Sequence, residues 1–103
     1  MLPLCGSMVS MIQSFHDNET LKVWEGEFSR KLPHDIQTVA RRKLRMLNNA
    51  RVIEDLRIPP NNKLEKLAHD REGHWSIRIN DQWRVCFVWE NGTASRVEIC
   101  DYH

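Results

Sequence analysis

The last three residues of the sequence, Asp101-Tyr102-His103, place a carboxylate, a phenol and an imidazole next to one another. Cleavage of RNA without a metal ion needs one group that takes a proton from the 2′-hydroxyl and another that protonates the departing 5′-oxygen. Histidine can do either near neutral pH. The tripeptide is compatible with this chemistry, although an isolated histidine at the end of a chain is more often idle and a tyrosine at a strand end more often only packs.

Arginines on one face of a predicted sheet could complete such a site. Arg78, Arg84 and Arg96 fall on the same polar face. A guanidinium can hold two phosphate oxygens and stabilise the charge that grows at phosphorus during cleavage. The predicted register also places Arg84 opposite Glu98, so an ordinary cross-strand ion pair explains Arg84 equally well.

Three strands are predicted from residue 74 onward, because apolar residues there recur at every second position. The apolar positions are Trp75, Ile77, Ile79, Trp83, Val85, Phe87, Trp89, Val97 and Ile99. A turn at residues 80–82 would pair Ile77 with Val85. The strands then form an antiparallel meander with one apolar side and one polar side.

The second turn contains Asn91-Gly92, a strong hairpin signal. A loop of these two residues alone would place Val85 opposite Glu98 and mix apolar with charged side chains. We therefore predict a three-residue loop, residues 90–92, which places Val85 opposite Val97.

Two helices are predicted before the meander. Asp17 or Asn18 would cap a short helix that runs through Trp24 and ends at Gly26. The second runs from about residue 35 to 49, with Pro33 in its first turn. Its apolar positions are Ile36, Val39, Ala40, Leu44 and Leu47, and the basic residues of its other face are Arg41, Arg42, Lys43 and Arg45. That basic face could meet phosphates or could simply be solvated.

The order of elements then predicts an α+β fold, β-α-α-β-β-β, with two helices packed on a mostly antiparallel sheet. The first strand is residues 11–15, at the edge of the sheet. Residues 57–70, with Pro59-Pro60, are expected to loop over the surface. Residues 11–103 form one domain, and residues 1–10 are interpreted as a dispensable lead-in.

Composition narrows the possible partners. The chain of 103 residues has 15 basic and 14 acidic side chains and a net charge of +1, so any RNA contact must come from local clustering. No apolar run approaches the roughly 20 residues of a membrane span. Cys5, Cys86 and Cys100 lack the spacing of a zinc site or a disulfide framework, which favours a reducing cytoplasm. No metal or other cofactor is expected, because no two histidines have the i, i+4 spacing that would place them on one face of a helix, and none lies near a set of cysteines.

Three stretches resemble a known family: Asp70–Gly73 followed by Trp75-Ser76-Ile77, the segment Asn80–Arg84, and the terminal Asp101-Tyr102-His103. Residues 11–103 are similar to the HigB toxins, or host-inhibition proteins, of the RelE/ParE superfamily. This resemblance implies a compact RelE-like fold and cleavage of mRNA in the ribosomal 30S A site. It also implies a helix-turn-helix antitoxin of the HigA type. The toxin would contact operator DNA only indirectly, through this antitoxin.

The resemblance implies catalytic roles for Arg84 on the scissile phosphate, Tyr102 on a base or the nucleophile, and His103 in proton transfer. Asp101 would orient His103 or fix the end of the strand. The sequence departs from the family where some members have a histidine and a lysine, since Glu65 and Ala68 stand there. Glu65 could replace the imidazole as general base. The candidates for RNA contact are Lys63, Lys66, Arg71 and Arg78.

Two other functions fit the same fold. ParE toxins resemble it but inhibit DNA gyrase without cleaving RNA. A toxin whose chemistry has weakened could act mainly as the partner that tunes its antitoxin's binding to DNA. The Tyr-His ending favours the ribonuclease, and Glu65 with Ala68 favours the weakened toxin.

Overall fold

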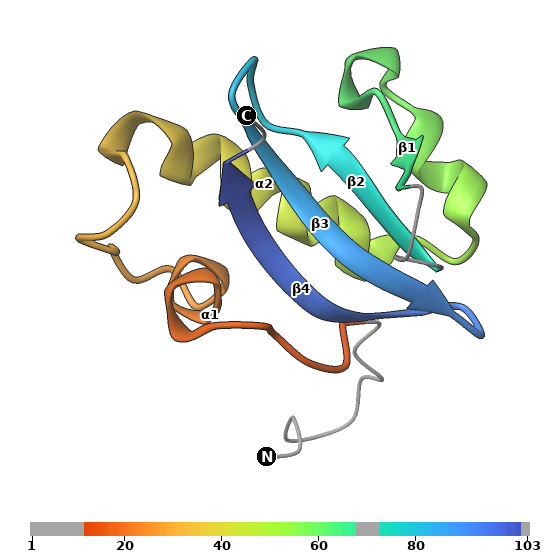
Figure 1. Cartoon of the computed structure of the whole chain (residues 1–103), viewed down its shortest axis with the longest axis horizontal. Coiled ribbons are helices and arrows are strands. Elements are labelled where there is room, and N and C mark those ends of the chain that lie inside the picture. The colour runs from red at the N-terminus through yellow and green to blue at the C-terminus, as the bar shows by residue number, and fades with distance from the viewer. Residues whose placement is uncertain (1–11, 68–72, 102–103) are drawn as a thin grey trace.

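The computed structural model describes residues 12–67 and 73–101. Its elements, in chain order, are α1 (Asn18–Trp24), α2 (His34–Asn49), the 3-10 helices η1 (Ile53–Arg57) and η2 (Pro60–Asn62), and the strands β1 (Glu65–Lys66), β2 (His74–Arg78), β3 (Trp83–Glu90) and β4 (Thr93–Asp101). The sheet has the order β1-β2-β3-β4, and each neighbouring pair is antiparallel. In Figure 1, α2 crosses one face of the sheet and α1 lies beside β4. The α+β class is confirmed.

The two helices begin and end close to where the sequence predicts. The Asp17 side chain caps α1 by accepting a hydrogen bond of 2.7 Å from the Thr20 backbone N–H, and Gly26 follows the helix with a φ of 86°. The Thr20 hydroxyl in turn accepts a 3.0 Å bond from the backbone N–H of Ile99, which ties α1 to β4.

Over the parts of the chain that the structure describes, no helix is long and apolar enough to cross a bilayer.

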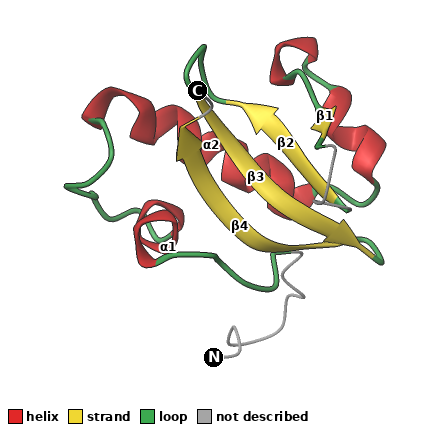
Figure 2. Cartoon of the chain, viewed as in Figure 1, coloured by secondary structure: helices red, strands yellow, loops and turns green. Residues whose placement is uncertain are grey.

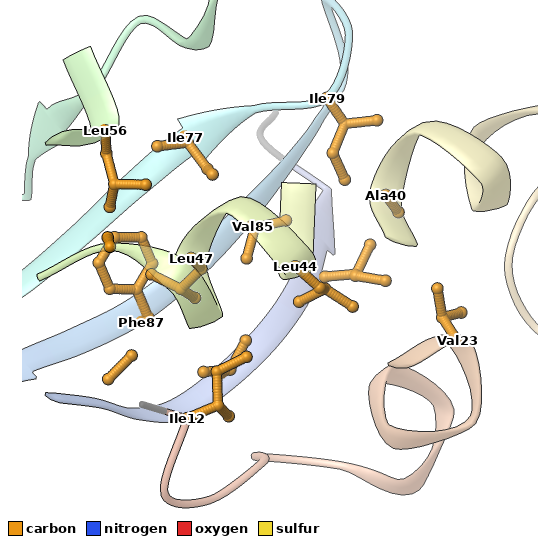
Figure 3. Close-up of a cluster of buried hydrophobic side chains, with 14 of the residues drawn as sticks. Ile12, Val23, Ala40, Leu44, Leu47, Leu56, Ile77, Ile79, Val85 and Phe87 are labelled. Atoms are coloured by element: carbon orange, nitrogen blue, oxygen red, sulfur yellow. The ribbon is translucent and has the colours of Figure 1, made fainter. Parts of the chain in front are cut away.

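The apolar stripe of α2 forms the centre of the core (Figure 3). Ala40, Leu44 and Leu47 are fully buried there, against Val85 and other side chains of the sheet. The core comprises Ile12, Val23, Ile36, Ala40, Leu44, Leu47, Ala50, Leu56, Ile77, Ile79, Val85, Phe87, Ala94, Val97 and Ile99. The apolar side of the predicted meander is therefore confirmed.

Lys43 departs from the predicted basic face of α2. Its side chain is only 6% exposed, and its ammonium group donates to the side chain of Asn62. The expectation that residues 57–70 loop over the surface is also wrong in part, because Asn62 is fully buried and β1 adds a fourth strand. In Figure 2, the two 3-10 helices and β1 gather at the edge of the sheet next to β2.

The β2–β3 register is as predicted, with Ile77 opposite Val85, but the β3–β4 register is not. The turn has two residues, Asn91 and Gly92, with φ of 53° and 77°, the left-handed values that suit the twist of a hairpin. Glu90 pairs with Thr93 and Trp89 with Ala94.

A β-bulge in β4 then returns the apolar side chains of β3 and β4 to the same face of the sheet. One residue of β3, Phe87, stands against two of β4, Arg96 and Val97, and Arg96 has a φ of 51°. Beyond the bulge Val85 pairs with Ile99. The apolar face is therefore kept by an inserted residue rather than by a longer loop.

The predicted edge strand at residues 11–15 is replaced by two isolated parallel bridges, Ile12 with Ala94 and Phe15 with Val97. Between them, the Ser14 hydroxyl accepts a 2.9 Å bond from the Arg96 backbone N–H at the bulge, and its carbonyl accepts from Val97. The segment borders β4 but is too irregular to be a strand. Residues 1–11, including the expected lead-in, lie outside the described residues.

Because Arg96 in the bulge has a left-handed backbone conformation, we expect a β-branched residue there to destabilise the fold. Arg96→Val should lower the free energy of unfolding by about 1–2 kcal/mol, because a β-branched side chain is strained at positive φ. Ser95→Val is the matched control, since the neighbouring extended backbone accepts valine. Urea denaturation measures both, and equal stability of the two variants would contradict the bulge.

Candidate active site

The sheet face away from α2 carries three residues of the predicted site, Arg84, Glu65 and Arg78. Paired residues share a face, and side chains alternate along each strand. One row across the sheet is Glu65, Ser76, Cys86 and Glu98, and the next is Arg78, Arg84 and Cys100. We call these seven residues the Arg84 face.

Arg84 is held at the centre of this face. Its Nε donates to the Ser76 hydroxyl at 2.8 Å, and Nη2 donates to the Lys63 carbonyl at 2.6 Å. The Glu65 carboxylate lies 3.7 Å from Nη2, so a half-exposed acid faces a guanidinium whose residue is only 7% exposed. Two acceptors and one carboxylate therefore compensate the buried charge.

The polar side of the predicted meander is not solvated at its centre. Ser76 is fully buried and Cys86 is 4% exposed. The physical reason lies in Arg84, whose side chain extends from β3 across β2 to the carbonyl of Lys63. Alternation places a side chain on a face but does not say what lies over it.

The predicted pairing of Arg84 with Glu98 is also wrong. The bulge shifts β4, so that Arg84 stands opposite Cys100 and Glu98 opposite Cys86. Glu98 instead lies 3.8 Å from His16 Nε2. Arg84 does have an acidic neighbour, but it is Glu65 from a segment that the sequence presents as a loop.

Asp101 lies on the opposite face of the sheet from Arg84, because Asp101 pairs with Trp83 while Arg84 pairs with Cys100. Its Oδ2 accepts a 3.0 Å bond from Gln82 Nε2 in an exposed setting. The structure does not bring this carboxylate onto the Arg84 face. Tyr102, His103, Arg71 and Ala68 lie outside the described residues.

Three of the candidates for RNA contact are described. Lys63 and Lys66 are exposed, and Lys66 Nζ lies 5.9 Å from the centroid of the Trp75 ring. Arg78 Nη2 binds Asp81 Oδ1 at 2.5 Å, and this hydrogen bond, helped by the charge of Arg78, holds the pKa of Asp81 below its usual value. Because Asp81 is fully exposed, the ion pair is weak and leaves Arg78 open to a competing phosphate.

The sequence analysis missed the link between Cys86 and Cys100, which form a disulfide across β3 and β4 with Cα atoms 6.7 Å apart. The prediction of unpaired cysteines is wrong because it considered spacing along the chain alone. Both residues lie on the polar face of neighbouring strands, and the observed register places them diagonally across from each other, with Cys86 opposite Glu98 and Cys100 opposite Arg84. The disulfide adjoins Arg84, which stands opposite Cys100.

Neither a metal-binding cluster nor the cavity between the helices adds to the Arg84 face. Within residues 12–67 and 73–101, no three His, Cys, Asp or Glu side chains gather closely enough to hold a metal ion. A cavity of about 390 Å³ lies between α1 and α2, lined in part by Phe28, Arg41 and Arg45. It contains no residue of the Arg84 face, so the chemistry we consider lies elsewhere.

Comparison with known proteins identifies the class. Residues 13–103 match the family model described as the RelE-like toxin of the type II toxin–antitoxin system HigB. The chain is 43% identical to Toxin HigB-1 of Vibrio cholerae over 65 residues, which cover 63% of this chain and 68% of the relative. It is 33% identical to an uncharacterized protein of Haemophilus influenzae over 86 residues, covering 82% and 85%. It is 46% identical to Endoribonuclease HigB of Proteus vulgaris over 41 residues, covering 40% and 45%.

Fold and sequence together define a compact α+β toxin domain of the RelE-like class. The chain belongs to the HigB-like family of type II toxin–antitoxin systems. The family expected from the short motifs is thus confirmed. Since a toxin of such a system is paired with an antitoxin, membership implies an antitoxin partner.

The disulfide makes a testable difference to stability. A crosslink that closes a loop of about 15 residues stabilises a fold by about 3 kcal/mol, so reduction should lower the urea midpoint of the wild-type protein. The double variant Cys86→Ser/Cys100→Ser is the control and should not respond to reductant. Thiol titration of the unfolded chain should find one reactive thiol before reduction and three afterwards, since two of its three cysteines are bonded. Three thiols before reduction would contradict the pairing.

Proposed function

We propose that this toxin is a metal-independent, ribosome-dependent endoribonuclease that cleaves translated mRNA in the 30S A site and so arrests growth. The observation that carries the proposal is Arg84, a guanidinium fixed by Ser76 and Lys63 beside the exposed carboxylate of Glu65. The name of the Proteus vulgaris relative, Endoribonuclease HigB, supports the same activity.

Arg84 is suited to stabilise the transition state. Charge accumulates on the phosphate oxygens during cleavage, and donors already held in place need no reorganisation when it does. Ser76 and Lys63 hold the guanidinium from two sides. We assign Arg84 to the scissile phosphate, with Arg78 on the same face as a second cation for the RNA backbone.

Proton transfer is assigned to Glu65 and His103. Glu65 is half exposed and lies 3.7 Å from Arg84, which makes it a candidate base for the 2′-hydroxyl. His103 is the leading candidate for proton transfer, Tyr102 for stacking on a base, and Asp101 for orienting His103 or fixing the strand end. These assignments to the end of the chain are supported by the pairing of β4 with β3. Cys100 stands opposite Arg84, and the pairing continues to Asp101, the next residue.

The ribosome is expected to supply most of the positioning. With a net charge of +1, the chain can neutralise few phosphates unaided. Lys63, Lys66, Arg71 and Arg78 would supply local contacts. The site of action is then the cytoplasm. A HigA-type helix-turn-helix protein is proposed as the antitoxin, and operator DNA would be reached only through it.

One observation favours a second candidate, a weakened toxin that acts mainly as its antitoxin's partner in autoregulation. Arg84 already donates to Ser76 and Lys63 and faces Glu65, so these contacts compete with a phosphate for its donors. This candidate predicts antitoxin binding with little or no RNA cleavage.

Induction in a bacterial host tests the site. Arg84→Lys keeps the charge but loses the planar fork, and should lower mRNA cleavage by about 100-fold and relieve growth arrest. His103→Ala should do the same. Arg57→Lys, at an exposed arginine of η1 that is not part of the Arg84 face, is the control, and circular dichroism verifies folding. If the Arg84 and His103 variants are as toxic as the wild type, the assignment of these two residues is wrong.

Primer extension with purified protein tests ribosome dependence. Cuts should appear at codon positions of mRNA that is being translated, and should vanish when ribosomes are omitted. Cleavage of free RNA at the same rate would refute dependence on the ribosome. Growth arrest with intact mRNA and a DNA-damage response would instead indicate a gyrase inhibitor of the ParE type.

A further inference from the structure

A buried polar connection joins helix α2 to the Arg84 face around the edge of the sheet. It begins at Lys43, whose ammonium nitrogen donates to Asn62 Oδ1 at 2.5 Å. Asn62 is fully buried, and its amide nitrogen donates to the carbonyls of Leu56 at 3.1 Å and Ile58 at 3.4 Å. Asn62 is therefore anchored from both its oxygen and its nitrogen.

The next residue completes the connection. Lys63 follows η2 in a left-handed conformation with a φ of 46°, and its backbone N–H donates to the Pro60 carbonyl at 3.1 Å. Its own carbonyl accepts the 2.6 Å bond from Arg84 Nη2. The left-handed backbone angles of Lys63, a φ of 46° and a ψ of 57°, relate its carbonyl to the peptide plane that joins Asn62 to Lys63, so the anchored asparagine restricts where that carbonyl can lie.

Lys43 occupies a position where an apolar side chain would be expected. It lies three residues after Ala40 and four before Leu47, on the buried stripe of α2. Burial lowers its pKa, and the charges of Arg42 and Arg78 lower it further, so the ammonium group is costly there. A neutral apolar residue would avoid that cost but could not bind the oxygen of Asn62.

We infer that Lys43 is a positioning residue for Arg84: through Asn62 it sets the Lys63 carbonyl that orients the guanidinium. This inference deepens the proposed function and rests on it for the role of Arg84 in cleavage. Lys43 need not touch RNA, because the connection reaches Arg84 through hydrogen bonds and the backbone of Asn62 and Lys63.

The variant Lys43→Met removes the ammonium group and keeps an unbranched stem. It should lower kcat for cleavage of translated mRNA about 10-fold and leave KM unchanged, because a small misplacement of a catalytic group slows the chemical step. Arg45→Met is the matched control, since it removes one charge from an exposed position of the same helix and should leave kcat unchanged. Lys43→Gln retains a donor and should show a smaller loss.

Nuclear magnetic resonance gives a measure that does not depend on activity. In the wild type the Nε proton of Arg84, bonded to Ser76, should exchange slowly with water, and Lys43→Met should speed that exchange at least roughly tenfold, as expected when an ordered contact opens locally. Exchange as slow as in the wild type, or faster exchange with kcat unchanged, would overturn the inference. If Lys43→Met fails to fold, Lys43→Gln decides in its place.

A double variant separates positioning from a general loss of stability. Once Arg84→Lys has removed the fork, Lys43→Met should add no further loss of kcat, whereas independent effects would multiply. Multiplying losses would therefore refute the connection. If the wild type does not cleave RNA at all, the proposed function fails, while proton exchange at Arg84 still decides whether Lys43 positions it.

Discussion

The buried guanidinium of Arg84 is the interaction on which the arrangement of the site depends. A charge withdrawn from water needs hydrogen-bond acceptors close by, and Arg84 finds them in Ser76 on β2 and in the Lys63 carbonyl. Through these hydrogen bonds, Arg84 connects β3 to β2 and to the segment before β1. The electrostatic requirement of one side chain thereby assembles three parts of the chain around it.

The rest of the fold makes these contacts possible. The core between α2 and the sheet holds β2 and β3 in register, while the 3-10 helices carry the chain around the sheet edge to Lys63. Lys43 and Asn62 hold that turn from the helix side. Structure and proposed function are linked here, because a preorganised cation stabilises a transition state only if its supports are themselves fixed.

Local rules predicted much of this molecule, and the failures share causes. The cap at Asp17, the buried stripe of α2 and the pairing of Ile77 with Val85 all follow from patterns within a few residues. The β3–β4 register, the neighbour of Arg84 and the disulfide were all missed, because a bulge at Arg96 shifts the strand. The burial of Lys43 and Arg84 was missed because their partners lie in a segment that looks like a loop.

By itself the sequence determined the two α-helices, the strands from residue 74 onward, the apolar face of the sheet and the family, since periodicity, caps and short motifs are properties of neighbouring residues. Only the tertiary structure decided which polar groups meet. The bulge is held by Ser14, 82 residues before Arg96 in the chain, and Arg84 is held by Lys63, 21 residues before it. Such contacts form only when the core brings distant segments together, so no local pattern specifies them.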